Sequence, residues 1–233
     1  MKATGTWQNE SAYHPPVTVI MQQLFRSPLL PVQELESRLQ EERIRRERFY
    51  EEMSEEQKVE FINGEVIVQS PAQLRHTTTG RNLLTLLDTY VSKHGLGCVG
   101  YEKILVTLTR NDYEPDIVYF GPEKARRLTP EQMKFPAPDI VVEVLSPLTE
   151  SNDRGLKFLD YAAHGIAEYW IIDPKAEMFE QYVLEDETYR LRIKTDSGTI
   201  RSVVLGGFAV PVRAIFDEDE KIAALQAILS SED

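Results

Sequence analysis

Between residues 114 and 173 the chain alternates short apolar runs with prolines and one helix-like segment, and this order limits the possible folds more than any other feature. The runs are rich in β-branched and aromatic residues and cover residues 114–120, 138–147 and 168–173. Short runs of this kind, bounded by proline or glycine, are typical of buried strands. The helix-like segment, residues 149–164, separates the last two runs. The pattern predicts an α/β (α+β) domain with a central sheet.

Two of the predicted strands carry an acid inside an otherwise apolar run: Asp116 in the first and Glu143 in the second. Burying an ionised carboxylate is costly unless a cation or a hydrogen-bond donor compensates it. If the two strands are neighbours, the acids would repel each other unless a divalent ion lay between them, and Mg²⁺ or Mn²⁺ is the natural hard-ion candidate. The alternative is that both acids lie at strand ends and face water or an arginine.

Residues 149–164 predict a short helix that ends at Gly165 and pairs Asp153 with Lys157 at i,i+4. Its predicted apolar face consists of Leu156, Leu159 and Ala163. A lysine in the first turns would lie over the carboxyl ends of the flanking strands, where ligands bind in α/β folds. There an ammonium group can orient water or stabilise developing negative charge. The alternative is a surface lysine paired with Asp153.

The order of these residues resembles the PD-(D/E)xK nuclease superfamily and, within it, a restriction endonuclease family that is abundant in cyanobacteria. The similarity covers about residues 49–216 and is densest at residues 138–174. Asp116, in Glu-Pro-Asp, resembles the first catalytic aspartate of the family. Glu143, in Val-Glu-Val-Leu-Ser-Pro, resembles its second acid.

The lysine departs from the superfamily pattern. It usually stands two residues after the second acid, where this chain has Leu145, and Lys157 on the following helix resembles a migrated replacement. Pro138-Asp139 also reads Pro-Asp. We assign Asp139 to a strand start, because Glu143 lies only four residues later and the two would share a strand.

The resemblance implies a restriction-endonuclease-like core, with a mixed central sheet flanked by helices, and a metal-dependent endonuclease that hydrolyses phosphodiester bonds in nucleic acid, with DNA favoured. Asp116 and Glu143 would hold Mg²⁺ or Mn²⁺, the Val144 backbone carbonyl would add a ligand, and Lys157 would position water.

Glu60 is a candidate for a further metal ligand. Its segment, residues 60–68, predicts a hairpin because Asn-Gly is flanked by alternating apolar residues. The alternative is that Glu60 faces solvent.

The net charge of −12 opposes tight binding of nucleic acid, because a protein that grips many phosphates usually presents a basic face. Weak or transient binding is therefore expected. An arginine cluster within residues 43–48 alternates with glutamates, which favours an exposed, self-neutralising helix. Two further function classes remain open: a catalytically degenerate nuclease-fold module that binds nucleic acid or protein, and an assembly protein built on the long N-terminal helix.

We expect residues 1–53 to form an N-terminal arm and helix, the arm being irregular over residues 1–30, and residues 54–233 to form one domain. Further helices are predicted at residues 76–94 and 217–230, the second with an apolar face of Ile222, Leu225, Ile228 and Leu229. Further strands are predicted at residues 99–108, 178–184, 189–194 and 200–205, the last three as a β-rich C-terminal extension of the sheet.

Cys98 is the single cysteine, so a disulfide within the chain is excluded and a reducing compartment is favoured. No apolar run approaches the length of a membrane span. We therefore expect a cytoplasmic protein, and a homodimer or higher homo-oligomer through the N-terminal helix.

His76 is interpreted as a helix-terminal or surface residue, because no second histidine stands at ligand spacing.

Overall fold

The computed structural model describes residues 32–54 and 57–231. The chain divides into two compact units, residues 1–45 and 46–233. Helix α2 (Val32–Glu52) begins in the first unit, where Arg38 and Glu34 form an i,i+4 ion pair at 2.8 Å. The irregular arm expected over residues 1–30 lies outside the described residues.

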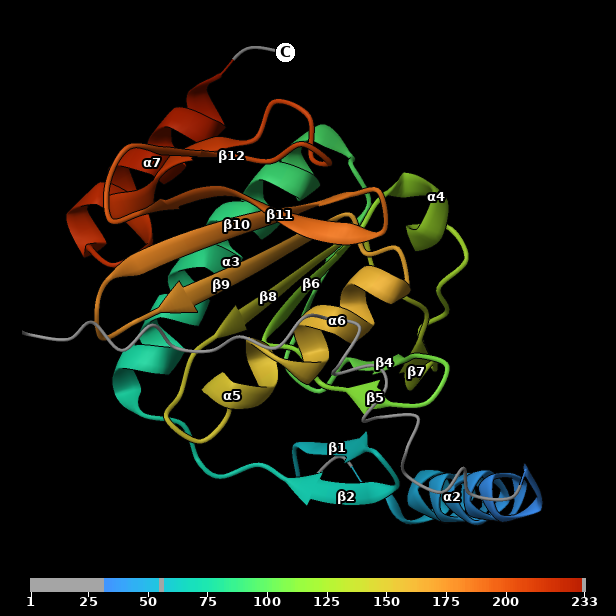
Figure 1. Ribbon diagram of the computed structural model, residues 1–233. Helices are drawn as coiled ribbons and strands as arrows, with labels where there is room; N and C mark the ends of the chain where they lie inside the picture. Colours follow the sequence, from blue (N-terminus) through green and yellow to red (C-terminus); the bar gives the residue numbers. More distant parts are fainter. Residues whose placement is uncertain (1–31, 55–56, 232–233) are drawn as a thin grey trace, which may run out of the picture. The chain divides into compact units, whose positions relative to one another are not determined.

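The second unit is built on a six-stranded sheet in the order β11-β10-β9-β8-β6-β3 (Figure 1). Strands β8 and β9 are parallel and the other neighbours are antiparallel, so the expected mixed sheet is confirmed. The strands are β3 (Cys98–Tyr101), β6 (Ile117–Phe120), β8 (Ile140–Val144), β9 (Glu168–Asp173), β10 (Met178–Glu185) and β11 (Thr188–Thr195).

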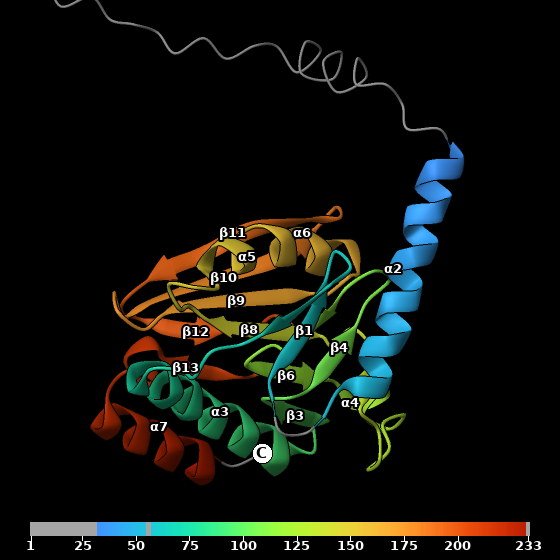
Figure 2. The same cartoon turned by 90° about the horizontal axis from the view of Figure 1, so that it is seen from below.

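Helices cover both faces of this sheet. Helices α3 (Leu74–His94) and α7 (Glu218–Ser230) lie side by side on one face, while α5 (Glu150–Asp153) and α6 (Leu156–Ala163) lie on the other (Figure 2). Alternate residues of β8 point to opposite faces, so Val142 packs with the leucines of α3 and Val141 packs with Tyr161 of α6. Both faces of β8 are therefore buried, which explains its nearly continuous apolar sequence.

The predicted helix over residues 149–164 is divided in two at Gly155, where a Cβ atom would lie 2.7 Å from the carbonyl oxygen of Ser151. The expected apolar face was wrong for two of its three residues: Leu156 packs against the core, but Leu159 is 69% exposed and Ala163 is also exposed. The buried face of α6 carries Lys157, Tyr161 and Ala162. The helix turns its lysine inward because buried carboxylates lie beneath it, as described below.

A second sheet of five strands has the order β2-β1-β5-β4-β7. Its strands are β1 (Val59–Ile62), β2 (Glu65–Val68), β4 (Leu105–Thr107), β5 (Asp112–Tyr113) and β7 (Lys134–Phe135), and the short helix α4 (Pro122–Ala125) follows β6. The predicted hairpin is confirmed. Asn63 and Gly64 both have positive φ (51° and 84°), which a two-residue turn of this type requires.

The single strand predicted over residues 99–108 was wrong. Glu102 and Lys103 have φ of 41° and 51°, so the chain turns there and divides into β3 and β4, which belong to different sheets. Only β3 pairs with β6, in the antiparallel register that matches Val99 with Tyr119. Asp112 begins β5.

The C-terminal extension agrees in part with expectation. Strands β10 and β11 extend the central sheet, but β12 (Thr199–Arg201) pairs with β13 (Ala209–Pro211) in a separate two-stranded sheet, which leads through the 3-10 helix η1 (Val212–Ile215) to α7. The predicted apolar face of α7 was also wrong in part, because Ile222 and Leu229 are 45% and 63% exposed. Two members of that face do lie inward, since Ile228 is buried and Leu225 packs against the core, so the prediction is confirmed in part. The buried residues of α7 are Lys221, Ala224 and Ile228. Within the described parts of the chain, every helix is too short or too polar to span a bilayer.

Candidate active site

A cleft of about 720 Å³ opens between the β1–β2 hairpin, the start of α3 and the carboxyl end of β8. Its walls include both acids expected from the sequence and the lysine expected beside them. The polar residues that line it include Lys58, Glu60, His76, Asp116, Glu143 and Lys157. The structure therefore brings Asp116, Glu143 and Lys157 together at one place.

The register of β6 and β8 sets the two acids side by side. Ile117 pairs with Val142, so Asp116, which precedes β6, lies opposite Glu143. Both side chains lie on the sheet face that is covered by α6. Asp116 and Glu143 each stand two positions from a residue of that face, Val118 and Val141 respectively, and residues two apart on a strand point the same way. Both acids are buried.

Lys157 lies beneath these acids with its ammonium group surrounded by three carboxylates. Its Nζ is 2.9 Å from Oε1 of Glu60, 3.0 Å from Oε1 of Glu143 and 3.2 Å from Oδ1 of Asp153. The side chain is 2% exposed, so the alternative of a surface lysine is wrong. The ammonium group forms ion pairs with all three carboxylates and donates a hydrogen bond to Oε1 of Glu143.

Asp116 is held from three directions. Lys58 Nζ lies 2.8 Å from its Oδ1, His76 Nε2 lies 3.3 Å from its Oδ2, and the backbone N–H of Val144 donates to Oδ2 at 2.8 Å. These partners come from the residue before β1, the first turn of α3 and the end of β8. The carboxylate is thereby fixed in place at the floor of the cleft.

The pKa values around Asp116 follow from these contacts. Burial alone would raise the pKa of Asp116, but Lys58 and His76 hold it well below its usual range. Burial would lower the pKa of His76 and of Lys58, yet the bonds and charge of Asp116 raise both above their ordinary values. Asp116 and the two cations therefore stabilise each other's charged forms, while Lys58 lowers the pKa of His76.

Glu143 is in a different electrostatic environment. Burial raises its pKa, and the neighbouring carboxylates of Asp153, Asp116 and Glu60 raise it further, against the opposing charge of Lys157. Its Oε1 also accepts a hydrogen bond from the Tyr161 hydroxyl at 3.0 Å. A cation near Glu143 would relieve this repulsion.

Glu60 is buried, so the alternative in which it faces solvent is wrong. Besides Lys157, it accepts a hydrogen bond from the backbone N–H of Glu114 at 3.1 Å. The Glu114 carboxylate in turn accepts from Val59 N–H at 2.8 Å. Burial raises the pKa of Glu114 to about 7. The two glutamates tie the hairpin to the segment that carries Asp116.

Sequence reasoning missed Lys58 and missed the contact of His76 with Asp116. Lys58 stands two residues before Glu60, and this spacing in an extended segment puts both side chains on one face, which was the available signal. His76 was interpreted as terminal or exposed, and it does lie in the first turn of α3, but its ring reaches Asp116. Asp139 lies at the start of β8, as expected, where it accepts from Gly121 N–H and pairs with Lys124.

The donor chemistry of the cleft fits a divalent cation. Asp116 and Glu143 offer hard oxygen ligands, and the backbone of Val144 lines the same cleft. Four buried carboxylates, Glu60, Asp116, Glu143 and Asp153, face the ammonium groups of Lys58 and Lys157 and the imidazole of His76. Across residues 32–54 and 57–231, no three His, Cys, Asp or Glu side chains converge as a preformed metal centre. The fit therefore rests on two carboxylates and one carbonyl.

A mixed sheet with an aspartate and a glutamate on adjacent strands, and a buried lysine on the following helix, defines a restriction-endonuclease-like protein. Residues 46–213 match the model of the Uma2 family, which is described as "Putative restriction endonuclease". This match spans more than half of the chain. The chain therefore belongs to the Uma2 family.

Two relatives accompany the family match. A crystal structure from Anabaena variabilis ATCC 29413, described as a "putative nuclease belonging to DUF820", superposes with a TM-score of 0.64 and 18% identity, covering 77% of this chain and 97% of that one. It shows the fold. A Synechocystis sp. (strain PCC 6803) protein described as "Uncharacterized protein slr1290" is 29% identical over 140 residues, 58% of this chain and 71% of that protein.

Proposed function

We propose that this protein is a metal-dependent endonuclease that hydrolyses phosphodiester bonds in nucleic acid, with DNA as the favoured substrate. The observation that carries the proposal is the placement of Asp116 beside Glu143 at the floor of an open cleft, with Lys157 bonded to Glu143. The family description supports the reaction class. Asp116, Glu143 and the Val144 carbonyl hold Mg²⁺ or Mn²⁺, and Glu60 is the adjacent candidate ligand.

When bound, the ion polarises the phosphoryl group and lowers the pKa of a coordinated water. Hydrolysis forms a bond between the water oxygen and phosphorus and breaks the bond from phosphorus to the leaving sugar oxygen. Lys157 holds Glu143 and Glu60 in fixed positions through direct ion pairs. Because these ion pairs hold its ammonium group, Lys157 acts by positioning these acids.

Lys58 and His76 provide positive charge on the open side of Asp116. Their side chains are 20% and 16% exposed, and both line the cleft. Both side chains are more exposed than that of Asp116, which is 8% exposed, so they are the more accessible to a phosphate in the cleft. We propose that they donate hydrogen bonds to the non-bridging oxygens of the phosphate, where negative charge develops during hydrolysis.

The direct test is cleavage by an Asp116→Asn variant. This change keeps the size of the side chain and removes its charge, so we expect loss of Mg²⁺- or Mn²⁺-dependent cleavage of plasmid DNA by about 100-fold or more. Asp139→Asn is the matched control, because it is the other Pro-Asp in the chain and lies at a strand start outside the cleft. Cleavage that survives Asp116→Asn would end the assignment.

Metal binding can be tested without a substrate. Calorimetric titration of Mn²⁺ into the wild type should show binding that is lost in Glu143→Ala. We expect a dissociation constant of about micromolar to millimolar, as is common for open carboxylate sites. Absence of binding to the wild type would favour the second candidate function, a degenerate module that binds nucleic acid or protein. The net charge of −12 and the ion pairs of Lys157 with three carboxylates are the observations that favour that alternative.

We further propose a homo-oligomer in the cytoplasm. The support is the exposure of three large apolar residues along α2, namely Leu35, Leu39 and Ile44, and a chain that contains a single cysteine. Light scattering on the full chain and on a Leu35→Glu/Leu39→Glu variant measures the oligomeric state. A mass that does not change in the variant would contradict assembly through this helix.

A further inference from the structure

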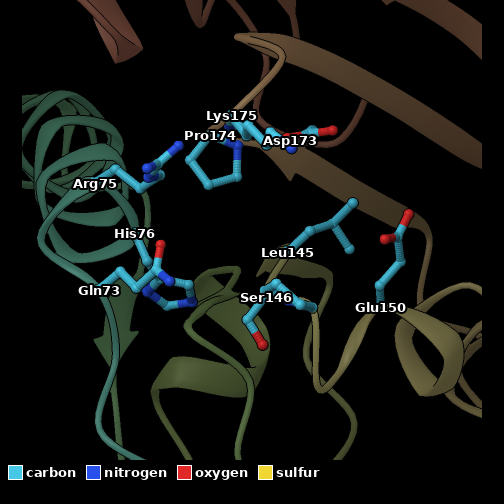
Figure 3. A pocket seen from close by; sticks show the side chains of 10 residues that line it. Gln73, Arg75, His76, Leu145, Ser146, Glu150, Asp173, Pro174 and Lys175 are labelled. Carbon is cyan, nitrogen blue, oxygen red and sulfur yellow. The ribbon is translucent and has the colours of Figure 1, made fainter.

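A second pocket of about 450 Å³ adjoins the candidate active site (Figure 3). The two cavities share Gln73, His76, Ser146 and Pro147, so a ligand can extend from one into the other without leaving the surface. The remaining lining residues of the second pocket are Arg75, Leu145, Glu150, Asp173, Pro174 and Lys175.

The pocket lies just beyond the carboxyl ends of the parallel strands β8 and β9. Leu145 and Ser146 follow β8, Pro174 and Lys175 follow β9, and Arg75 belongs to the first turn of α3. The crevice outside the carboxyl ends of parallel strands is where α/β folds bind their ligands. Position alone thus makes this pocket a candidate for holding part of the substrate.

The cations of the pocket are available to a ligand, whereas its acids are engaged. Arg75 and Lys175 are exposed, and no ion pair joins either side chain to another residue in the described parts of the chain. Glu150 instead pairs with Arg154 at 3.0 Å, and Asp173 accepts hydrogen bonds from two backbone N–H groups of the turn that follows it. The pocket therefore offers two unpaired positive charges, and an anion is the complementary ligand.

The shape and the remaining lining indicate what carries this anion. Figure 3 shows the Arg75 side chain reaching from α3 toward Pro174 and Lys175, with Leu145 and Ser146 on the strand side. Pro147 and Pro174 add rigid apolar surface suited to contact with a sugar or a base. A volume of this size holds a group larger than a free phosphate ion.

We propose that this pocket binds the nucleotide next to the scissile phosphate, with Arg75 and Lys175 contacting the phosphate of that nucleotide and Pro147 and Pro174 contacting its sugar or base. The inference deepens the proposed function and rests on it, because it assigns the pocket to the same nucleic-acid strand. His76 lies on the wall shared by the two cavities. A strand that crosses this wall therefore places one phosphate beside Asp116 and the adjacent nucleotide in the second pocket.

The test measures binding without cleavage. A short fluorescein-labelled single-stranded oligodeoxynucleotide of mixed sequence is titrated by fluorescence anisotropy at low salt in EDTA, so that no divalent ion is present. The variant is Arg75→Ala/Lys175→Ala. The matched control is Arg190→Ala/Arg192→Ala, which removes the same charge from two exposed arginines of β11. Circular dichroism verifies that both variants fold.

We expect the pocket variant to bind about tenfold more weakly than the wild type and the β11 control to stay within about twofold. The slope of log K against log salt should also fall by about 0.7 for each phosphate contact that is lost. Equal weakening in the two double variants, or no binding by the wild type, would overturn the subsite. If the wild type cleaves DNA and all three proteins bind the oligonucleotide equally well, the subsite is contradicted but the proposed function is not. Weaker oligonucleotide binding by the pocket variant alone, with no cleavage by the wild type, would support the subsite and contradict the proposed function.

Discussion

Lys58 places its ammonium nitrogen 2.8 Å from Oδ1 of Asp116, and both residues line the cleft. His76 reaches the other oxygen, Oδ2, at 3.3 Å. Asp116 is thus neutralised by cations of the chain itself. A divalent ion that binds this carboxylate has to displace Lys58 or accept its repulsion, so Lys58 and the ion compete for the same ligand.

Replacement of Lys58 should therefore strengthen metal binding while it weakens catalysis. We expect Lys58→Met to bind Mn²⁺ about tenfold more tightly, which corresponds to about 1.4 kcal/mol. Calorimetry on the two proteins measures this difference. The matched control is Lys124→Met, since Lys124 pairs with Asp139 outside the cleft and its loss should leave Mn²⁺ affinity unchanged. Weaker Mn²⁺ binding by Lys58→Met would show that the lysine supports the metal site and does not compete with it.

Removal of Lys157 should destabilise the fold, because it leaves Glu60, Glu143 and Asp153 buried without their common partner. We expect Lys157→Met to lower the free energy of unfolding by about 3–5 kcal/mol at neutral pH. Urea denaturation at pH 7 and pH 5 measures the effect, which should be smaller at pH 5 because protonation of the carboxylates relieves the repulsion. A loss that is equal at both pH values would contradict this origin.

The sequence was sufficient to find Asp116 and Glu143, because a carboxylate inside an apolar strand is a local signal. It also sufficed for the hairpin, since Asn63-Gly64 specifies the turn type. It failed for the inward face of α6. There a simple apolar pattern selected Leu159, while the actual partners of the helix are acids from two sheets, brought together by strand pairing over long distances in the chain.

The role of Lys58 was hidden for the same physical reason. Its partner, Asp116, lies 58 residues away, and their contact depends on how the hairpin and β6 are placed in the fold. The break between β3 and β4 was also hidden, because Glu102 and Lys103 adopt positive φ without a glycine to mark the turn. Local propensity does not report contacts or turns that tertiary structure imposes.

Glu168 should be the main polar anchor of the C-terminal extension. Its Oε1 accepts from the Ser202 hydroxyl and from the backbone N–H groups of Val203 and Val204, and its Oε2 accepts from the Trp170 indole N–H and the Gln181 amide. Glu168→Ala leaves these donors without an acceptor in the protein. We expect a loss of about 3–5 kcal/mol, measured by urea denaturation.

The control for this anchor is Ser202→Ala, which removes one of the five bonds and should cost about 1 kcal/mol. Hydrogen exchange adds a local measurement. The amides of Val203 and Val204 should exchange faster in Glu168→Ala than the difference in global stability accounts for. Equal stability losses in the two variants would contradict the role of Glu168 as a shared acceptor.

Glu180 should make the protein less stable in acid. Burial would raise its pKa, but Arg154, Tyr182 and Lys194 hold it at about 2, below the ordinary value of 4.5. Because the pKa in the folded state is the lower one, the stabilising contribution is fully present above about pH 4.5 and is lost as the pH falls toward 2. The cations are partly exposed, at 32% for Arg154 and 52% for Lys194, so solvent screening limits the contribution to about 1–2 kcal/mol.

Glu180→Gln isolates this contribution, because glutamine has no carboxyl proton to gain. The variant should be less stable than the wild type by about 1–2 kcal/mol at pH 6, and the gap should close between pH 4.5 and pH 2. Thermal or urea unfolding across this pH range measures the gap. Glu185→Gln, at the exposed end of the same strand, should follow the wild type throughout. A gap for Glu180→Gln that stays constant to pH 2 would mean that the bonds of the side chain, and not its ionisation, provide the stability.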